Sequence, residues 1–199
     1  MSWIRIIDRA AAQGRLRALY ERLQGPGGRI DNIMKVHALR PHTLDGHMSL
    51  YRSVLHHAGN RLQRDWLETL GVYVSHLNRC SYCVEHHFAG LRRLLDDDVR
   101  AHQIREALES GELAGAFDER EQAMLRYARE LTRQPPAVVQ GQVEALREAG
   151  LEEGEILEVN QVVAYFAYAN RTALGLGVTT AGEALGLTAG DTAVDWRHC

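Results

Sequence analysis

The chain has 199 residues, of which 45% are hydrophobic and 25% charged, so it is long enough to bury one sizeable core. Its formal net charge of -3 comes without a cluster of Lys and Arg, which disfavours binding to nucleic acid or anionic membranes. No apolar run approaches the roughly 18 residues that a membrane-spanning helix needs, and Met1 to Arg9 lack the apolar segment of a signal peptide. We therefore expect a cytoplasmic protein with neither a nucleic-acid nor a membrane partner.

Helical patterns run through the first third of the chain, and cap and turn residues divide it into three segments. These are a helix over about residues 9 to 23 that Asp8 caps and Gly25-Pro26-Gly27-Gly28 ends, a short helix that Asp31 opens and Pro41 ends, and a helix that Thr43 caps and Gly59-Asn60 ends.

The next segment predicts two consecutive helices. Its apolar residues repeat every three or four positions from Leu62 to Leu77, which is typical of a long helix with one buried face. Asn78-Arg79 is a candidate turn, and a second helix is expected from about Cys80 to Leu95. If the chain reverses at this turn, the two helices form an antiparallel hairpin with Cys80 at the start of the second.

Helical patterns also account for most of the remaining chain. Asp118 is expected to start a helix that reaches Leu131, and Pro135-Pro136 separates it from a helix that ends near Gly150. The last helix, over about residues 153 to 174, is so apolar that we place it either in the centre of the fold or in a subunit interface. Since strand patterns and linkers are scarce, the sequence predicts one all-α domain over residues 1–199.

Two of the three cysteines are close in sequence, in the segment Cys80-Ser81-Tyr82-Cys83, and His87 follows one helical turn after Cys83. In a reducing compartment, a close cysteine pair is more often redox-active or metal-binding than structural. On a helix, Cys80, Cys83 and His87 lie on one stripe, and the cysteines are near enough to form a disulfide. Cys199 is interpreted as an exposed tail thiol without a role.

The start of a helix is a favourable place for a reactive thiol, because free backbone N–H groups and the helix dipole stabilise the thiolate. This argument favours Cys80 as the more acidic cysteine. In the hairpin, Glu68 and His87 would lie side by side at similar distances from the turn. Glu68 could then orient His87, and His87 could pass protons to and from the thiols.

Other interpretations of these residues stay open. The cysteine pair could be incidental, or Cys80 and Cys83 could bind structural zinc with His86 or His87. The chain could also be a redox sensor or an oligomeric scaffold whose cysteines become oxidised slowly without catalytic turnover of a substrate. The remaining histidines are interpreted as packing or surface residues: His37, His42, His47, His56, His57, His76 and His102.

The spacing of four residues carries a family resemblance. The pattern consists of a Glu, eleven further residues and then C-x-x-C-x-x-x-H. Glu68, Cys80, Cys83 and His87 match it at every position. This pattern resembles the alkylhydroperoxidase D-like branch of the carboxymuconolactone decarboxylase superfamily, specifically its peroxidase-related proteins. The resemblance covers about residues 30 to 177, and it includes the segments Asn32 to His37, Leu39-Arg40-Pro41, Val74-Ser75 with Asn78, and Val163 to Phe166 with Asn170-Arg171.

The resemblance implies an all-α helical bundle that assembles as a homo-oligomer and reduces hydroperoxides through its cysteine pair. It assigns Cys83 as the cysteine that peroxide oxidises, Cys80 as the cysteine that resolves the product, and His87 with Glu68 as a proton relay. No dinucleotide-binding or phosphate-binding glycine motif is present. We therefore expect no cofactor and no metal, and an external thiol or dithiol protein must supply the electrons.

Overall fold

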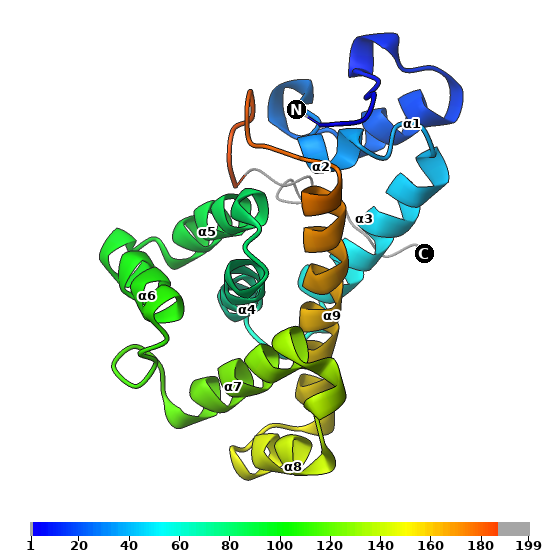
Figure 1. Ribbon diagram of the computed structural model, residues 1–199. Helices are drawn as coiled ribbons and strands as arrows, with labels where there is room; N and C mark the ends of the chain where they lie inside the picture. Colours follow the sequence, from blue (N-terminus) through cyan, green and yellow to red (C-terminus); the bar gives the residue numbers. More distant parts are fainter. Residues whose placement is uncertain (1, 187–199) are drawn as a thin grey trace.

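The computed structural model describes residues 2–186, and the fold within this range is entirely helical. The prediction of an all-α fold is therefore confirmed. The helices in chain order are α1 (Gly14–Leu23), α2 (Asn32–Lys35), α3 (Pro41–Leu55), α4 (Arg64–Leu77), α5 (Ser81–Leu95), α6 (Asp98–Ser110), α7 (Glu119–Arg133), α8 (Gln140–Glu148) and α9 (Glu153–Gly175). They are arranged around α4 and α9, as Figure 1 shows.

The first helix begins later than the sequence suggests. Residues Arg9–Ala11 form only a short 3-10 turn, and the Asp8 side chain makes no cap hydrogen bond. Ala12 then returns to extended backbone with φ -69° and ψ 138°, and its side chain is buried in the core. The prediction of a continuous helix from residue 9 is wrong, because burial of Ala12 requires the chain to turn before α1.

The position of Pro41 also differs from expectation. Pro41 does not end the preceding helix but is the first residue of α3, and Arg40 occupies the N-cap position. Proline suits the first helical turn, because its fixed φ is already helical and its missing N–H has no partner there anyway. Thr43 is therefore not the cap; it lies inside the first turn and its hydroxyl donates to the Arg40 carbonyl at 2.8 Å.

One helix was not predicted at all. Helix α6 begins after Asp97, whose side chain accepts a hydrogen bond from the backbone N–H of Arg100 at 2.9 Å. It ends at Gly111, which adopts the left-handed conformation at φ 82°. Its buried side chains include two alanines, so its apolar stripe is short and weak in the sequence, although both end signals are present.

The turn between α4 and α5 fixes the start of α5. The backbone N–H of Arg79 donates to the carbonyl of His76 at 2.9 Å, and that of Cys80 donates to Ser75 at 2.9 Å. Together these bonds form a Schellman motif, with Arg79 in the left-handed conformation at φ 58°. The chain therefore reverses as predicted, and Cys80 becomes the residue immediately before α5.

Helix α9 is the centre of the fold. It contacts α3, α4, α5, α7 and α8, and Figure 1 shows it as the long orange helix that stands beside the α4–α5 hairpin. Gly71 of α4 allows this close approach, because a Cβ atom there would lie 2.3 Å from the ring of Phe166. Of the two placements expected for α9, the structure shows the central one.

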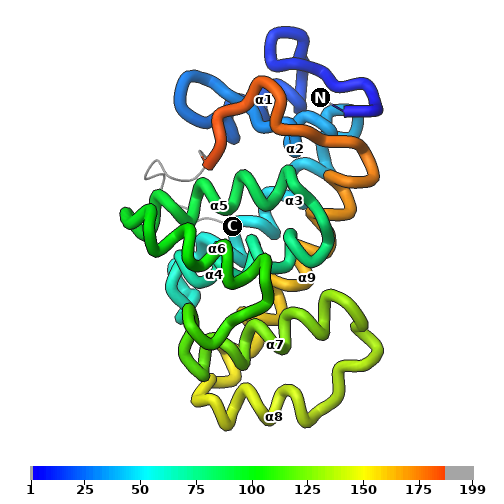
Figure 2. The backbone as a smooth tube through the Cα atoms, turned by 60° about the vertical axis from the view of Figure 1, so that its left-hand side comes forward, coloured from blue at the N-terminus to red at the C-terminus, as the bar shows by residue number. Residues whose placement is uncertain are grey.

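The segment that follows α9 returns over the start of the fold. Figure 2 shows residues 176–186 in orange passing beside α2 and toward α5. Val178 packs in a small buried cluster with Cys80, Tyr82 and Cys83. Among the described residues, no helix has both the length and the apolar character needed to cross a membrane.

Candidate functional site

The two cysteines of the C-x-x-C segment meet at the start of α5. Their sulfur atoms are 3.0 Å apart and joined by a hydrogen bond, and both are free thiols. Cys80 is 1% exposed and Cys83 is 4% exposed. An oxidant that removes two electrons and two protons from the pair would need to bring the sulfur atoms only about 1 Å closer to form a disulfide.

The two thiols differ in acidity. The hydrogen bond from Cys83 lowers the pKa of Cys80, burial opposes this effect, and the backbone N–H of Cys83 lowers the pKa further. The same hydrogen bond, burial and the charge on Cys80 raise the pKa of Cys83 well above its ordinary value, although Asn170 opposes them. Cys80 is therefore the more acidic of the two thiols, as the argument from the helix start predicts.

Glu68 and His87 lie side by side across the hairpin. Oε2 of Glu68 is 2.6 Å from Nδ1 of His87, and both side chains are largely buried. The ring of Phe166 packs edge-on against His87 at 4.6 Å between centroids. Gly90 lies against the carboxylate, and a Cβ atom there would be in ordinary van der Waals contact with it at 3.7 Å. The hairpin brings these two residues together, while their catalytic roles stay predictions.

A cavity of ≈ 50 Å³ opens beside these residues, between α3, α5 and α9. Cys83, Glu68 and His87 all line it, but Cys80 does not. The remaining lining residues are Asp31, Ile33, Met34, His47, Met48, Tyr51, Tyr82, His86, Gly90, Tyr165 and Ala169. A molecule in this cavity therefore meets Cys83 before it can meet Cys80.

Several of these lining residues were not singled out from the sequence. His47 and Tyr51 on α3 and Tyr165 on α9 are far apart in the chain, and only the packing of the two helices brings them to one place. Their ring centroids form a chain of contacts, with 5.8 Å from His47 to Tyr165 and 5.7 Å from Tyr165 to Tyr51. Helical spacing alone marks them only as buried residues.

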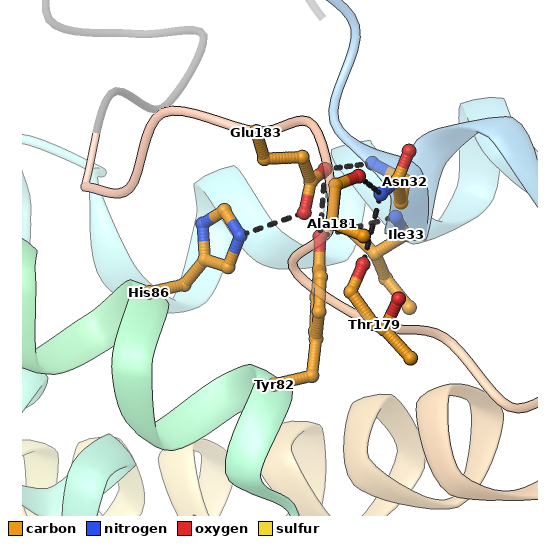
Figure 3. A network of polar contacts seen from close by, with 7 residues as sticks. All are labelled: Asn32, Ile33, Tyr82, His86, Thr179, Ala181 and Glu183. Atoms are coloured by element: carbon orange, nitrogen blue, oxygen red, sulfur yellow. Dashed lines mark hydrogen bonds and ion pairs between the residues drawn. The ribbon is translucent and has the colours of Figure 1, made fainter. Parts of the chain in front are cut away.

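A polar network borders the cavity, because its members Ile33, Tyr82 and His86 also line it. Figure 3 shows the network. Glu183 accepts hydrogen bonds from the backbone N–H of Asn32 and from the Tyr82 hydroxyl. Its other oxygen lies 3.1 Å from Nε2 of His86. The Asn32 side chain donates to the carbonyl of Thr179 at 2.8 Å. The segment after α9 is thereby attached to α2 and α5, next to the cysteine pair.

Asn170 links α9 to the turn that positions Cys80. Its side chain is fully buried, donates to the hydroxyl of Ser75 and accepts from the side chain of Asn78, both at 3.0 Å. Ser75 and Asn78 are residues of the Schellman motif at the end of α4. Asn170 therefore holds the hairpin turn against α9, which fixes the place of the cysteines relative to the cavity.

The donor atoms do not converge as a metal site requires. Within residues 2–186, no group of three His, Cys, Asp or Glu side chains is placed to hold a metal ion. His86 is directed to Glu183 and His87 to Glu68, so neither completes a site with the two sulfur atoms. The zinc alternative therefore has no ligand set in this part of the chain. Cys199 lies outside the described residues.

Comparison with solved structures identifies the architecture. The chain superposes with a TM-score of 0.77 and 25% identity on an uncharacterized peroxidase-related protein from Ralstonia eutropha JMP134, described as an alkylhydroperoxidase AhpD core, covering 89% of this chain and 91% of that one. This fold is alkylhydroperoxidase D-like. An uncharacterized peroxidase-related protein from Silicibacter sp. TM1040 is also similar, with a TM-score of 0.72, 25% identity and coverage of 82% and 83%. The resemblance seen in the sequence is thus confirmed.

The alkylhydroperoxidase D-like fold carries more than one chemistry. The debrominase Bmp8 superposes with a TM-score of 0.72 at 16% identity, covering 87% of this chain and 89% of that protein. At this identity the likeness concerns the fold alone, so the reaction must be argued from the site. No family model and no curated protein matches the sequence.

Proposed function

We propose that the chain is a thiol-dependent peroxidase that reduces hydroperoxides through Cys80 and Cys83. The observation that supports it most is the position of Cys83: it lines the same small cavity as the Glu68–His87 pair and lies 3.0 Å from a second thiol. A peroxide in this cavity has a nucleophile, a resolving thiol and a hydrogen-bonded acid–base pair within reach.

The first step is proton transfer inside the thiol pair. Cys80 carries the resting charge and accepts the proton of Cys83 along the 3.0 Å hydrogen bond, which creates the Cys83 thiolate at the cavity wall. That thiolate attacks the terminal oxygen of the hydroperoxide, and the O–O bond breaks. The products are a sulfenic acid on Cys83 and an alkoxide, which takes a proton and leaves as the alcohol.

The second step closes the disulfide. Cys80 loses its proton and attacks the sulfur of the Cys83 sulfenic acid, which releases hydroxide that is protonated to water. In this scheme His87 donates a proton to the departing alkoxide or hydroxide and recovers one from Cys80, while Glu68 fixes its orientation through the 2.6 Å hydrogen bond. Two thiols are oxidised, and one hydroperoxide is reduced to alcohol and water.

The cycle needs an external thiol or dithiol reductant to return the disulfide to two thiols. We propose that this reductant is a second protein or a small thiol in the cytoplasm, and that the chain works as a homo-oligomer. Leu157, Tyr168 and Leu174 expose apolar side chains along α9, which agrees with a further contact there. Sedimentation of the purified chain tests the oligomeric state.

Steady-state turnover tests the proposed function. Purified protein with tert-butyl hydroperoxide and excess dithiothreitol should consume many equivalents of hydroperoxide per chain, and Cys83→Ser should abolish this consumption. A disulfide that forms once but is not followed by turnover, with several dithiol reductants, would instead support the redox-sensor alternative. Zinc that co-purifies in a one-to-one ratio and stabilises the fold would support the structural alternative.

A further inference from the structure

The cavity holds one buried polar group that the proposed chemistry does not use. His47 is 4% exposed, and its Nδ1 has no hydrogen-bond partner among the residues that the structure describes. Its other ring nitrogen, Nε2, lies 3.3 Å from the hydroxyl of Tyr165. Unpaired buried nitrogen atoms are rare because leaving one without a partner is costly, so this one calls for a ligand.

The protonation of His47 can be derived from its surroundings. Burial, and then the neighbouring His37, lower the pKa of His47 to about 3, so the ring is neutral. Burial raises the pKa of Tyr165 well above its ordinary value, so its hydroxyl keeps its proton. A phenol is the stronger donor and an imidazole nitrogen the stronger acceptor, so the hydroxyl donates to Nε2. The ring proton then sits on Nδ1, which becomes a donor without an acceptor.

This donor shares its cavity with the cysteine. His47 and Cys83 both belong to the wall of the ≈ 50 Å³ cavity. Tyr165 connects them, because its hydroxyl bonds to His47 and it is near enough to Cys83 and Glu68 to feel their charges. Most of the remaining wall is apolar, with Met34, Met48 and Ala169 among its members.

The charged groups around the cavity are predominantly carboxylates. Asp31 and Glu68 belong to its wall, although Asp31 is ionised only above its pKa of about 6. Glu183 lies 3.1 Å from His86, another wall residue. The basic groups that line the cavity are imidazoles: His86 and His87, which are already bonded to Glu183 and Glu68, and neutral His47. Arg29 and Lys35 lie outside the lining and act on Asp31. A ligand with its own carboxylate would lose its hydration and face negative charge, which opposes its entry.

Resting on the proposed function, we propose that His47 Nδ1 donates a hydrogen bond to an oxygen of a small, uncharged hydroperoxide, and that the cavity excludes hydroperoxides that carry a carboxylate. His47 is then a residue that sets substrate choice, supported in its orientation by Tyr165. The inferred substrate class is thus small hydroperoxides without a carboxylate.

Two substitutions separate the ring nitrogens of His47. The amide of Asn can place an N–H where Nδ1 stands, while the amide of Gln reaches the position of Nε2 and keeps an acceptor for Tyr165. The rate of Cys80–Cys83 disulfide formation with tert-butyl hydroperoxide should fall about tenfold in His47→Gln, the loss expected for one hydrogen bond, and return to within about threefold of the original chain in His47→Asn. Equal rates in both variants and the original chain would overturn the proposal.

A matched substrate tests the exclusion of charge. The compound 3-hydroperoxy-3-methylbutanoate is tert-butyl hydroperoxide with one hydrogen replaced by a carboxylate. It should oxidise the original chain about 100-fold more slowly than tert-butyl hydroperoxide, while both compounds should oxidise free dithiothreitol at similar rates. Comparable rates on the protein would overturn the inferred substrate class, although the peroxidase function itself would stand.

If no hydroperoxide oxidises the protein, the proposed function fails. A binding measurement then tests the His47 site by itself. The imidazole nitrogen signals of His47 can be followed by nuclear magnetic resonance during titration with tert-butanol, the alcohol that the reaction would produce. A saturable shift of Nδ1 with tert-butanol, and none with 3-hydroxy-3-methylbutanoate, would support a neutral-ligand site at His47. No shift with either compound would overturn it.

Discussion

Oε2 of Glu68 lies 2.6 Å from Nδ1 of His87, although 19 positions separate the two residues in the chain. The contact exists because Arg79 takes the left-handed conformation and reverses the chain between α4 and α5. A carboxylate oxygen accepts hydrogen bonds, so Nδ1 of His87 is the donor in this pair and Nε2 is left for proton exchange. This arrangement gives His87 the orientation of a general base.

Replacing Glu68 by Gln tests this pairing. Glu68→Gln preserves the size of the side chain and an oxygen acceptor but removes the negative charge that stabilises a protonated His87. The rate of disulfide formation with stoichiometric hydroperoxide should fall about 100-fold, the lower end of what acid–base catalysis contributes. Rapid-quench alkylation followed by mass spectrometry measures this rate.

Glu85→Gln is the matched control, because Glu85 lies on α5 but forms a partly exposed ion pair with Arg105 at 2.8 Å. Its rate should equal that of the original chain, and its stability should change by less than about 0.5 kcal/mol. A similar loss of rate in both variants would show that the charge of Glu68 has no special role.

Asp31 makes the stability of the fold depend on pH. Burial raises its pKa from 3.8 to about 6, with His86 opposing the rise and Glu183 adding to it. The folded chain therefore holds this proton more tightly than the unfolded chain, and the stability that it contributes is lost as the pH rises from about 4 to about 6. Asp31→Asn, which keeps a good helix-capping residue before α2, should remove that loss.

Urea unfolding at about pH 4 and about pH 7 measures the effect. The free energy of unfolding of Asp31→Asn, relative to the original chain, should rise between these pH values by up to about 3 kcal/mol. Glu183 and His86 are present in both proteins, so their own titration largely cancels. A difference that does not change with pH would contradict the buried, protonated state of Asp31.

The hairpin turn requires a strained backbone conformation at Arg79. It is exposed and has a φ of 58°, a region that glycine adopts without the steric conflict of a side chain. Arg79→Gly should therefore raise the free energy of unfolding by about 0.5–1 kcal/mol. Arg79→Ala keeps the Cβ atom and should give no such gain, so an equal gain in both variants would locate the effect in the lost charge instead.

The acidity of Cys80 should depend on the thiol of Cys83. The hydrogen bond from Cys83 is the largest cause of the lowered pKa of Cys80. Cys83→Ala removes this donor, so the thiolate absorption of Cys80 should appear at higher pH than in Cys83→Ser, whose hydroxyl still donates. Identical titrations of the two variants would mean that the backbone N–H of Cys83 alone stabilises the Cys80 thiolate.

The sequence was sufficient for the parts of the fold that local signals determine. The turn at Asn78-Arg79, the helix starting after Asp118 and the helix over about residues 153 to 174 all appear in the structure near their predicted ends. The Asp118 prediction succeeded because its side chain and that of Glu121 form a reciprocal capping box, a signal that needs no distant contact.

The misses have physical causes of two kinds. Pro41 has two opposite local effects, because proline disfavours a helix before it and suits the first turn of a helix. The sequence prediction used only the first effect, whereas Pro41 begins α3. Ala12 interrupts the first expected helix because its side chain is buried in the core. Local helix propensity gives no sign of this burial.

The same division applies to the site. Glu68, Cys80, Cys83 and His87 share one hairpin, so their spacing was enough to bring them together. His47, Tyr165 and Glu183 come from α3, α9 and the segment beyond it, and only tertiary packing places them at the cavity. His47 was interpreted as a packing or surface residue for this reason.

The most direct test of the account is the fate of the thiols after one equivalent of tert-butyl hydroperoxide. Alkylation and mass spectrometry of the reduced chain should find a disulfide between Cys80 and Cys83, and the Cys80→Ser variant should accumulate a sulfenic acid on Cys83 that a dimedone probe traps. If Cys80 and Cys83 both stay free thiols, or if the sulfenic acid forms on Cys80 in Cys83→Ser and not on Cys83 in Cys80→Ser, the account is contradicted.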